Sequence, residues 1–163
     1  WEAEALRGAV KGLSAAVVRL GVVLSADGGA LAQMAPAFRR FVGGPVGDGQ
    51  QWFPWIHMQD LVSALVFLAE RPELTGAFNL SAPEPVRNRD MAAALGRALN
   101  RPAVMPAPAF LLRAVLGEFA SVLLGSHRMV PHRLVKSGFT FRYPEIGAAL
   151  AAIFGPRDAE GRS

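Results

Sequence analysis

A helical segment that leads directly into a short apolar strand is the feature of this sequence that most restricts its fold. Residues 2–11 carry charges at helical spacing, Gly12 and Ser14 end that helix, and the apolar run 15–20 has the length of a strand. A helix that feeds a buried strand forms a crossover unit, and such a strand needs a parallel neighbour. We expect that neighbour upstream of Trp1, so the chain is predicted to be the second part of a longer α/β polypeptide.

The pattern that follows alternates strands and helices and ends in a helical cluster. We predict a loop over 21–29, a helix over 30–41, a loop leading into an extended stretch over 47–58, a helix over 61–70, a strand over 77–80 and a helix over 88–99. Helices are also predicted over 107–125, 131–137 and 144–154, with a strand or turn at 139–142 and a frayed tail over 155–163. No internal repeat interrupts this order, which indicates an α/β fold class.

Side-chain spacing predicts which faces of these helices are buried. The helix over 30–41 places four apolar residues on one face: Leu31, Met34, Phe38 and Phe41. The helix over 88–99 turns five residues inward: Met91, Ala94, Leu95, Ala98 and Leu99. Polar residues at the helix starts are predicted to be caps, with Gln59 and Asp60 before the helix over 61–70 and Asn88 before the other.

Composition excludes several classes of protein. The chain has 163 residues, 52% of them hydrophobic, which is enough for one globular core. The net charge is +4, but the arginines are scattered and form no basic patch, so we expect no nucleic-acid partner. There is no cysteine, and the longest apolar stretch, residues 106–116, is shorter than the roughly 20 residues of a membrane span. We therefore expect a soluble, cytoplasmic protein without membrane contact.

Two common ligand motifs are absent. His57, His127 and His132 share no metal-binding spacing, so no metal site is predicted. The glycine-dense segment 43–49 neither follows an apolar strand nor opens a helix, and it has no lysine. It is therefore not predicted to bind phosphate as a dinucleotide or mononucleotide loop does.

Two other segments have features of a small-molecule site. Residues 19–24 form an apolar strand that runs into a loop, and open α/β sheets bind ligands beyond the carboxyl ends of their strands. Residues 50–60 combine flat aromatic rings with polar groups, and we predict that Gln51, Trp52, Trp55 and His57 line a pocket. The alternative is that Trp55 packs in the core.

Arg87 is predicted to reach an anionic group of the ligand. Its guanidinium matches phosphate oxygens in a bidentate fashion. The alternative is an ordinary exposed residue before a helix.

Seven segments, in order along nearly the whole chain, resemble one protein family. They are RLGVVL (19–24), DGGAL (27–31), GGPVG (43–47), QWFPWIHMQDL (51–61), FNLSAP (78–83), RP (101–102) and GFTFRYP (138–144). They resemble the atypical extended short-chain dehydrogenases/reductases that are called nucleoside-diphosphate-sugar epimerase-like or cell-division-inhibitor-like proteins. The resemblance implies the C-terminal part of an NAD(P)-binding Rossmann-type fold with a small, mostly helical C-terminal lobe.

The resemblance also implies a division of the chain and a cofactor. Residues 1–80 would hold the last crossover of the Rossmann-type domain and substrate-lobe segments, residues 81–155 an α-rich lobe whose last part is usually a domain of unknown function, and residues 156–163 a tail. NADP or NAD would be bound mainly by upstream sequence. The strand end would touch the cofactor's nicotinamide end through five residues: Arg19, Gly21, Val22, Val23 and Leu24.

No catalytic residue is predicted in this chain. The family's glycine-rich fingerprint and its Tyr-x-x-x-Lys pair are not found: Tyr143 is in another context, and Arg7 stands four residues before Lys11. The resemblance implies that the longer polypeptide is an epimerase or oxidoreductase acting on a sugar nucleotide or a similar small metabolite. The helices that pair in many family members would fall mostly upstream, so a homodimer is an option for the longer polypeptide.

Two alternatives stay open at this point. The same scaffold could be a non-enzymatic module that senses the cofactor or regulates cell division, and upstream sequence with a glycine motif but no Tyr-x-x-x-Lys pair would favour it. A freestanding helical binding module is the third reading. The apolar run 17–20 argues against it, because an unpaired strand edge invites aggregation.

Overall fold

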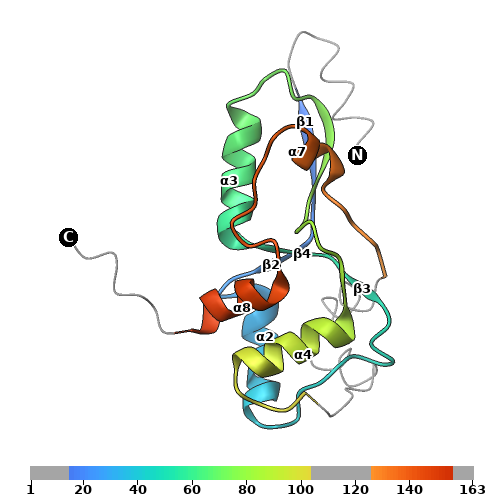
Figure 1. Ribbon diagram of the computed structural model, residues 1–163, viewed down its shortest axis with the longest axis vertical. Helices are drawn as coiled ribbons and strands as arrows, with labels where there is room; N and C mark the ends of the chain where they lie inside the picture. The colour runs from blue at the N-terminus through green and yellow to red at the C-terminus, as the bar shows by residue number, and fades with distance from the viewer. Residues whose placement is uncertain (1–14, 104–125, 156–163) are drawn as a thin grey trace, which may run out of the picture.

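The computed structural model describes residues 15–103 and 126–155 (Figure 1). The helices predicted over 2–11 and 107–125 and the tail over 156–163 lie outside these ranges. The elements, in chain order, are β1 Ala16–Leu20, β2 Val22–Leu24, α2 Gly29–Arg39, β3 Trp52–Phe53, β4 Trp55–His57, α3 Met58–Ala69, β5 Gly76–Leu80, β6 Val86–Arg87, α4 Asn88–Ala98, α7 His132–Lys136 and α8 Ile146–Phe154.

One neighbour of β1 lies within this chain. β1 pairs in parallel with β5, in a register that runs from Ala16 opposite Gly76 to Leu20 opposite Leu80. The expectation that every neighbour is upstream was therefore wrong for one edge of β1. The strand that became β5 was predicted, but pairing between distant segments leaves no local pattern in a sequence.

β2 replaces part of the loop predicted over 21–29. It pairs in parallel with β4, with Val22 opposite Trp55 and Leu24 opposite His57. Gly21 separates the two pairings: its N–H donates to the carbonyl of Leu80 (3.0 Å), and the N–H of Val22 donates to the carbonyl of Pro54 (2.7 Å). The glycine thus marks a transfer of the chain from one strand partner to another.

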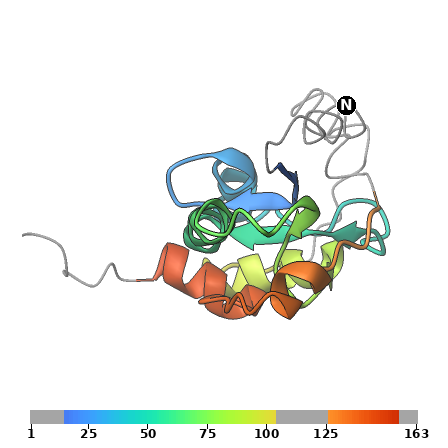
Figure 2. The same cartoon turned by 90° about the horizontal axis from the view of Figure 1, so that it is seen from above.

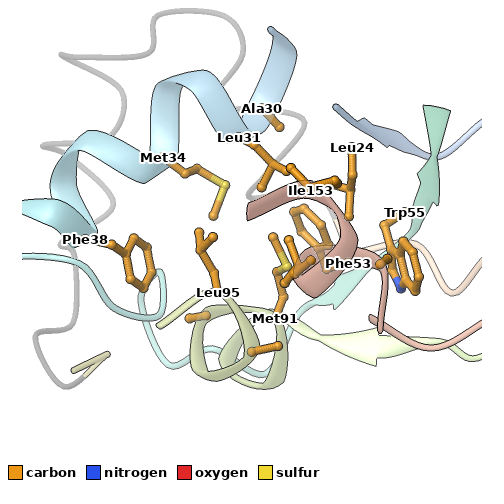
Figure 3. Packing of buried hydrophobic residues seen from close by; sticks show 14 of the residues in the cluster. Leu24, Ala30, Leu31, Met34, Phe38, Phe53, Trp55, Met91, Leu95 and Ile153 are labelled. Atoms are coloured by element: carbon orange, nitrogen blue, oxygen red, sulfur yellow. The ribbon is translucent and has the colours of Figure 1, made fainter. Parts of the chain in front are cut away.

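The strands lie between helices. Figure 2 shows α2 and α3 on one side of the strands and α7 and α8 on the other. α4 and α8 pack against each other, and α2 reaches α4, as Figure 3 shows for Met34 and Phe38 of α2 facing Leu95 and Met91 of α4. No described helix has the length and apolar character that crossing a bilayer would require.

The buried apolar residues form two clusters that meet at β4. The first, cluster 1, joins β2, β3 and β4 to α2, α4 and α8, and it contains Trp55. The second, cluster 2, joins β4, β5, α3 and α7, and it contains Ile56. Neighbouring residues of a strand point to opposite faces, so β4 contributes one residue to each cluster.

Three details of the predicted helices were wrong. Phe41 lies beyond the end of α2 with a φ of 62° and is 56% exposed, so it does not join Leu31, Met34 and Phe38 in the core. α3 begins at Met58, and its cap is His57, whose Nδ1 accepts the N–H of Gln59. Asn88 accepts the N–H of Val46 (2.7 Å) and does not cap α4.

Candidate functional site

A hollow of about 310 Å³ lies at the carboxyl end of β1 and along β2. Its lining comes from the β1–β2 segment, from Pro54 and from the first residues of α2. A second hollow of about 290 Å³ shares Val23 and Gly29 with it and extends to Ser25, Asp27 and Met58. Ligands of open α/β sheets bind in this position, beyond the carboxyl ends of the strands.

The start of α2 adds a favourable site for negative charge. Gly29 and Ala30 line the first hollow, and the first turn of α2 holds no acidic residue. The N–H groups of a first helical turn have no partner within the helix, and the helix dipole places partial positive charge there. The hollow can therefore accept an anionic group at this end.

The five residues predicted to contact the cofactor do not all reach this hollow. Gly21, Val22 and Val23 line it, whereas the side chain of Leu24 is fully buried in cluster 1. Arg19 is an exposed residue of β1 and is not part of the lining. The strand alternation that turns Leu24 inward could not be read from a segment predicted as a loop.

A second group of residues gathers around Trp52. β3 and β6 are antiparallel, and their register sets Trp52 opposite Arg87. The guanidinium carbon of Arg87 lies 3.6 Å from the centroid of the indole ring, and one of its nitrogens donates to the carbonyl of Gln50. This cation–π contact holds the guanidinium in one orientation.

Arg128 completes this group and was missed by the sequence reasoning. Its guanidinium carbon lies 5.4 Å from the Trp52 ring centroid, and Ser126 nearby accepts the N–H of Trp52 (3.2 Å). The two segments are more than 70 residues apart, so no spacing pattern could have joined them. We call Trp52, Arg87 and Arg128 the tryptophan–arginine group.

This group carries positive charge that no described carboxylate neutralises. Within residues 15–103 and 126–155, neither Arg87 nor Arg128 forms an ion pair. Gln51 lies next to the group, and its side-chain nitrogen donates to the carbonyl of Val46 (3.1 Å). An anion could therefore approach two guanidinium groups beside a flat aromatic face.

Trp55 and His57 are not part of that surface, contrary to the prediction of one shared pocket. Trp55 is 1% exposed and belongs to cluster 1, so its ring has no surface to offer a ligand. His57 is 7% exposed, and its ring lies on that of Tyr143 with centroids 4.1 Å apart. β4 is buried on both faces, with Ile56 between them also fully buried, and an aromatic-rich segment alone does not reveal that its strand is interior.

The pKa of His57 reflects this burial. Desolvation lowers the pKa below its ordinary value, the charge of Asp60 opposes the shift, and the charge of Arg142 adds to it. Because Nδ1 accepts a hydrogen bond from Gln59, the proton of the neutral ring is on Nε2.

Asp60 connects the start of α3 to a distant segment. We call residues 139–143, which lie between α7 and α8, the strap. The carboxylate of Asp60, itself 2% exposed, accepts the backbone N–H groups of Arg142 (2.8 Å) and Tyr143 (2.9 Å). These bonds replace the capping role predicted for Asp60, and the strap has none of the strand character considered at 139–142.

No described group of three or more potential ligand side chains could hold a metal ion. Tyr143, the single tyrosine of the sequence, lies on His57 and is part of the strap attachment.

Two family models match the chain. The model described as NAD dependent epimerase/dehydratase family matches residues 1–81, and the model described as Domain of unknown function (DUF1731) matches residues 107–153. An "Epimerase family protein SDR39U1 homolog, chloroplastic" of Arabidopsis thaliana is 47% identical over 94% of this chain and 44% of its own length. The mouse "Epimerase family protein SDR39U1" is 44% identical over 84% of this chain and 47% of its own length.

The chain spans about half the length of the curated relatives that it matches. Among solved structures, that of the human epimerase family protein SDR39U1 with NADPH is 41% identical, with a TM-score of 0.79 over 85% of this chain and 47% of that one. A UDP-N-acetylglucosamine 4-epimerase from Bacillus cereus, 12% identical with a TM-score of 0.67, shares the fold alone. These similarities confirm the predicted α/β, Rossmann-type fold class.

Proposed function

Because the chain belongs to the extended short-chain dehydrogenase/reductase family, in its nucleoside-diphosphate-sugar epimerase-like branch, we propose that it forms the second half of an NADP(H)-binding epimerase or oxidoreductase. The upstream half would hold most of the cofactor. This chain would supply the wall at the nicotinamide end and the substrate-binding surface.

The hollow at the β1–β2 junction is the observation that carries the cofactor proposal. It is bordered by Gly21, Val22 and Val23, the backbone stretch predicted to contact the cofactor. The human relative with NADPH in its structure is 41% identical to this chain, which supports the same cofactor here. NADP(H), when bound, supplies the hydride chemistry, and the residues of this chain would orient it and exclude water.

The tryptophan–arginine group is the proposed contact for the substrate. Its two guanidinium groups suit the phosphate oxygens of a sugar nucleotide, and Gln51 beside it offers a further hydrogen-bonding group. The indole ring of Trp52 adds a flat apolar face next to these charges. Trp55 and His57 would act only by supporting the β4 strand behind it.

A cofactor titration tests the first part of the proposal. Tryptophan fluorescence would be followed during addition of NADPH, with NADH as comparison, to this chain and to a longer polypeptide that continues it upstream. We expect saturable quenching in the longer polypeptide. Ser25→Glu, which adds a carboxylate to the second hollow, should weaken NADPH binding about tenfold, because the added negative charge would repel the phosphates of NADPH.

Ala26→Glu is the matched control, because Ala26 is the exposed neighbour of Ser25 and lines neither hollow. NADPH affinity that is equal in wild type and Ser25→Glu would contradict a cofactor that lies across the two adjoining hollows. NADPH binding without turnover of any sugar nucleotide would favour the cofactor-sensing alternative over an enzyme.

A further inference from the structure

The glycine-dense segment between α2 and β3 folds back on the start of α4. We call residues 46–51 the capping loop. The N–H of Asn88 donates to the carbonyl of Gln51 (2.9 Å), and the N–H of Arg89 donates to the carbonyl of Gly49 (3.0 Å). These two N–H groups belong to the first turn of α4, where they have no partner within the helix. The loop therefore caps α4 with its own backbone carbonyls.

Asn88 adds a side-chain bond to this contact. It is 1% exposed, and its Oδ1 accepts the N–H of Val46 at 2.7 Å. The carbonyl of Val46 in turn accepts the N–H of Gly49 (2.9 Å) and the side-chain nitrogen of Gln51 (3.1 Å). An asparagine at the start of a helix usually accepts an N–H of that helix, but Asn88 accepts one from the capping loop instead. Both ends of the loop are thereby fixed to α4.

The capping loop adjoins two members of the tryptophan–arginine group. Trp52 directly follows the loop, and Arg87 directly precedes Asn88, so the bonds of Asn88 lie next to the register pair of Trp52 and Arg87. A guanidinium nitrogen of Arg87 also donates to the carbonyl of Gln50 in the loop (2.6 Å). The same guanidinium lies over the Trp52 ring, 3.6 Å from its centroid. A loop that moved away from α4 would take the Gln50 carbonyl with it, and the guanidinium would lose that hydrogen bond.

We propose that Asn88 is the positioning residue of the tryptophan–arginine group. It holds the capping loop where the Gln50 carbonyl keeps the Arg87 guanidinium over the Trp52 ring. This role rests on the function proposed above, in which the group binds phosphate oxygens of the substrate. A guanidinium that is already fixed before binding loses less side-chain freedom when an anion arrives. Asn88 therefore raises the affinity for the anion without touching it.

Two glycines of the capping loop make different demands on the space around them. Gly47 (φ 57°) and Gly49 (φ 67°) both lie in the left-handed region. A Cβ on Gly49 would lie 2.8 Å from the Cβ of Arg89 and 3.0 Å from the Cβ of Pro45, whereas a Cβ on Gly47 would meet no atom within 4 Å. The close approach of the loop to α4 therefore requires a glycine at position 49 in particular.

Nuclear magnetic resonance of the chain without ligand tests the positioning directly. An indole ring shifts the resonances of protons above its face, so the side-chain protons of Arg87 report whether the residue lies over Trp52. Trp52→Leu, which has no ring, gives the resonances expected for a lost contact. Asn88→Ala removes the acceptor of the Val46 N–H and should lose most of the ring-current shift. Asn88→Asp keeps an oxygen acceptor there and should retain the shift, and circular dichroism checks that both variants are folded.

Gly49→Ala and Gly47→Ala form a matched pair that leaves Asn88 in place. Both put an alanine at a left-handed φ and carry similar backbone strain, but only Gly49→Ala pushes the loop away from Arg89. Gly49→Ala should therefore lose the ring-current shift of Arg87, and Gly47→Ala should keep it. A shift that persists in both Asn88→Ala and Gly49→Ala would overturn the proposal.

Calorimetric titration with inorganic pyrophosphate connects this position to binding. Asn88→Ala should weaken pyrophosphate binding about tenfold, because one charge-assisted hydrogen bond is no longer held in place. Asn100→Ala is the control: it removes an asparagine just beyond the other end of α4 and should leave the affinity unchanged. Equal affinities of wild type and Asn88→Ala would also overturn the proposal. If wild type does not bind pyrophosphate, the proposed substrate contact fails instead, and the ring-current shift still decides whether Asn88 positions Arg87.

Discussion

Asp60 shows how one buried carboxylate can fix a tertiary connection. It lies in the first turn of α3, where the helix dipole favours negative charge, and it accepts two backbone N–H groups of the strap. Hydrogen bonds to an ionised acceptor are stronger than neutral ones. The strap is thereby attached at the exact point where β4 ends and α3 begins.

Replacing Asp60 should detach the strap. Asp60→Ala leaves the N–H groups of Arg142 and Tyr143 without acceptors, and we expect the free energy of unfolding to fall by about 1–3 kcal/mol. Urea denaturation measures this change. Glu84→Ala, at an exposed acidic residue, should change it by less than about 0.5 kcal/mol. Equal effects of the two variants would mean that the Asp60 bonds contribute nothing specific.

His57 should make stability depend on pH. Burial lowers the pKa of His57 in the folded chain below the ordinary value of 6.5, so the unfolded chain takes up the proton first as the pH falls. The contribution of His57 is therefore fully present above pH 6.5 and is lost as the pH falls towards the lowered pKa.

The variant His57→Asn isolates this effect. Its side-chain oxygen can still accept the N–H of Gln59 at the start of α3, but it does not titrate. We expect a shallower loss of unfolding free energy between neutral and mildly acidic pH than in wild type, measured by urea denaturation at a series of pH values. Parallel curves for the two proteins would rule out His57 as the group responsible.

At the scale of elements, the junction between β1 and β2 depends on a glycine. A Cβ on Gly21 would lie 3.1 Å from the carbonyl carbon of Pro54 and from the nitrogen of Trp55. Both are backbone atoms, so the neighbouring chain would have to move. The same junction borders the proposed cofactor site, so its geometry matters for binding and for stability.

Gly21→Ala should therefore destabilise the chain by about 1–3 kcal/mol in urea denaturation, through overpacking of this backbone contact. Gly147→Ala in α8 is the comparison with the opposite sign, because a Cβ there meets no atom within 4 Å and alanine favours a helix by up to about 1 kcal/mol. If Gly21→Ala were as stable as wild type, the close approach at Pro54 would be softer than the structure indicates.

The sequence predicted the positions of helices and strands better than it predicted which of them pair or contact each other. Strand β5 and helices α2, α3, α4, α7 and α8 were each expected near their observed positions, because periodicity and Gly or Pro breakers are local signals. β2 was missed because its three residues are all apolar and show no alternation of apolar and polar side chains. The β1–β5 pairing and the strap attachment join distant segments, so no local pattern encoded them.

The residues predicted for the candidate site were also only partly brought together by the fold. Trp52 and Arg87 were chosen for their chemistry and do lie together, while Trp55 and His57, only a few residues away, face the interior. A segment rich in aromatic residues does not show which of its strands is interior: β4 is buried on both faces, whereas β3 leaves Trp52 partly exposed. Arg128 had no sequence signal, since only the fold brings it to Trp52.

At the scale of the whole molecule, the two hydrophobic clusters should unfold together. β4 supplies Trp55 to one cluster and Ile56 to the other, so neither can be lost without exposing the back of the strand. Leu150→Ala in cluster 1 and Leu134→Ala in cluster 2 should each cost about 2–5 kcal/mol. Hydrogen exchange with mass spectrometry should show α3 and α4 losing protection in one step in both variants. Separate steps would mean that the clusters are independent units.

The connection between Asp60 and the strap also sets an order in time. A ribosome adds about 5–20 residues per second, and the 82 residues that separate Asp60 from Arg142 take roughly 4–16 s to synthesise. During that interval β4 and α3 are made, but the two backbone N–H groups that donate to the Asp60 carboxylate do not yet exist. The junction between β4 and α3 can therefore acquire these two hydrogen bonds only after residue 143 has been made.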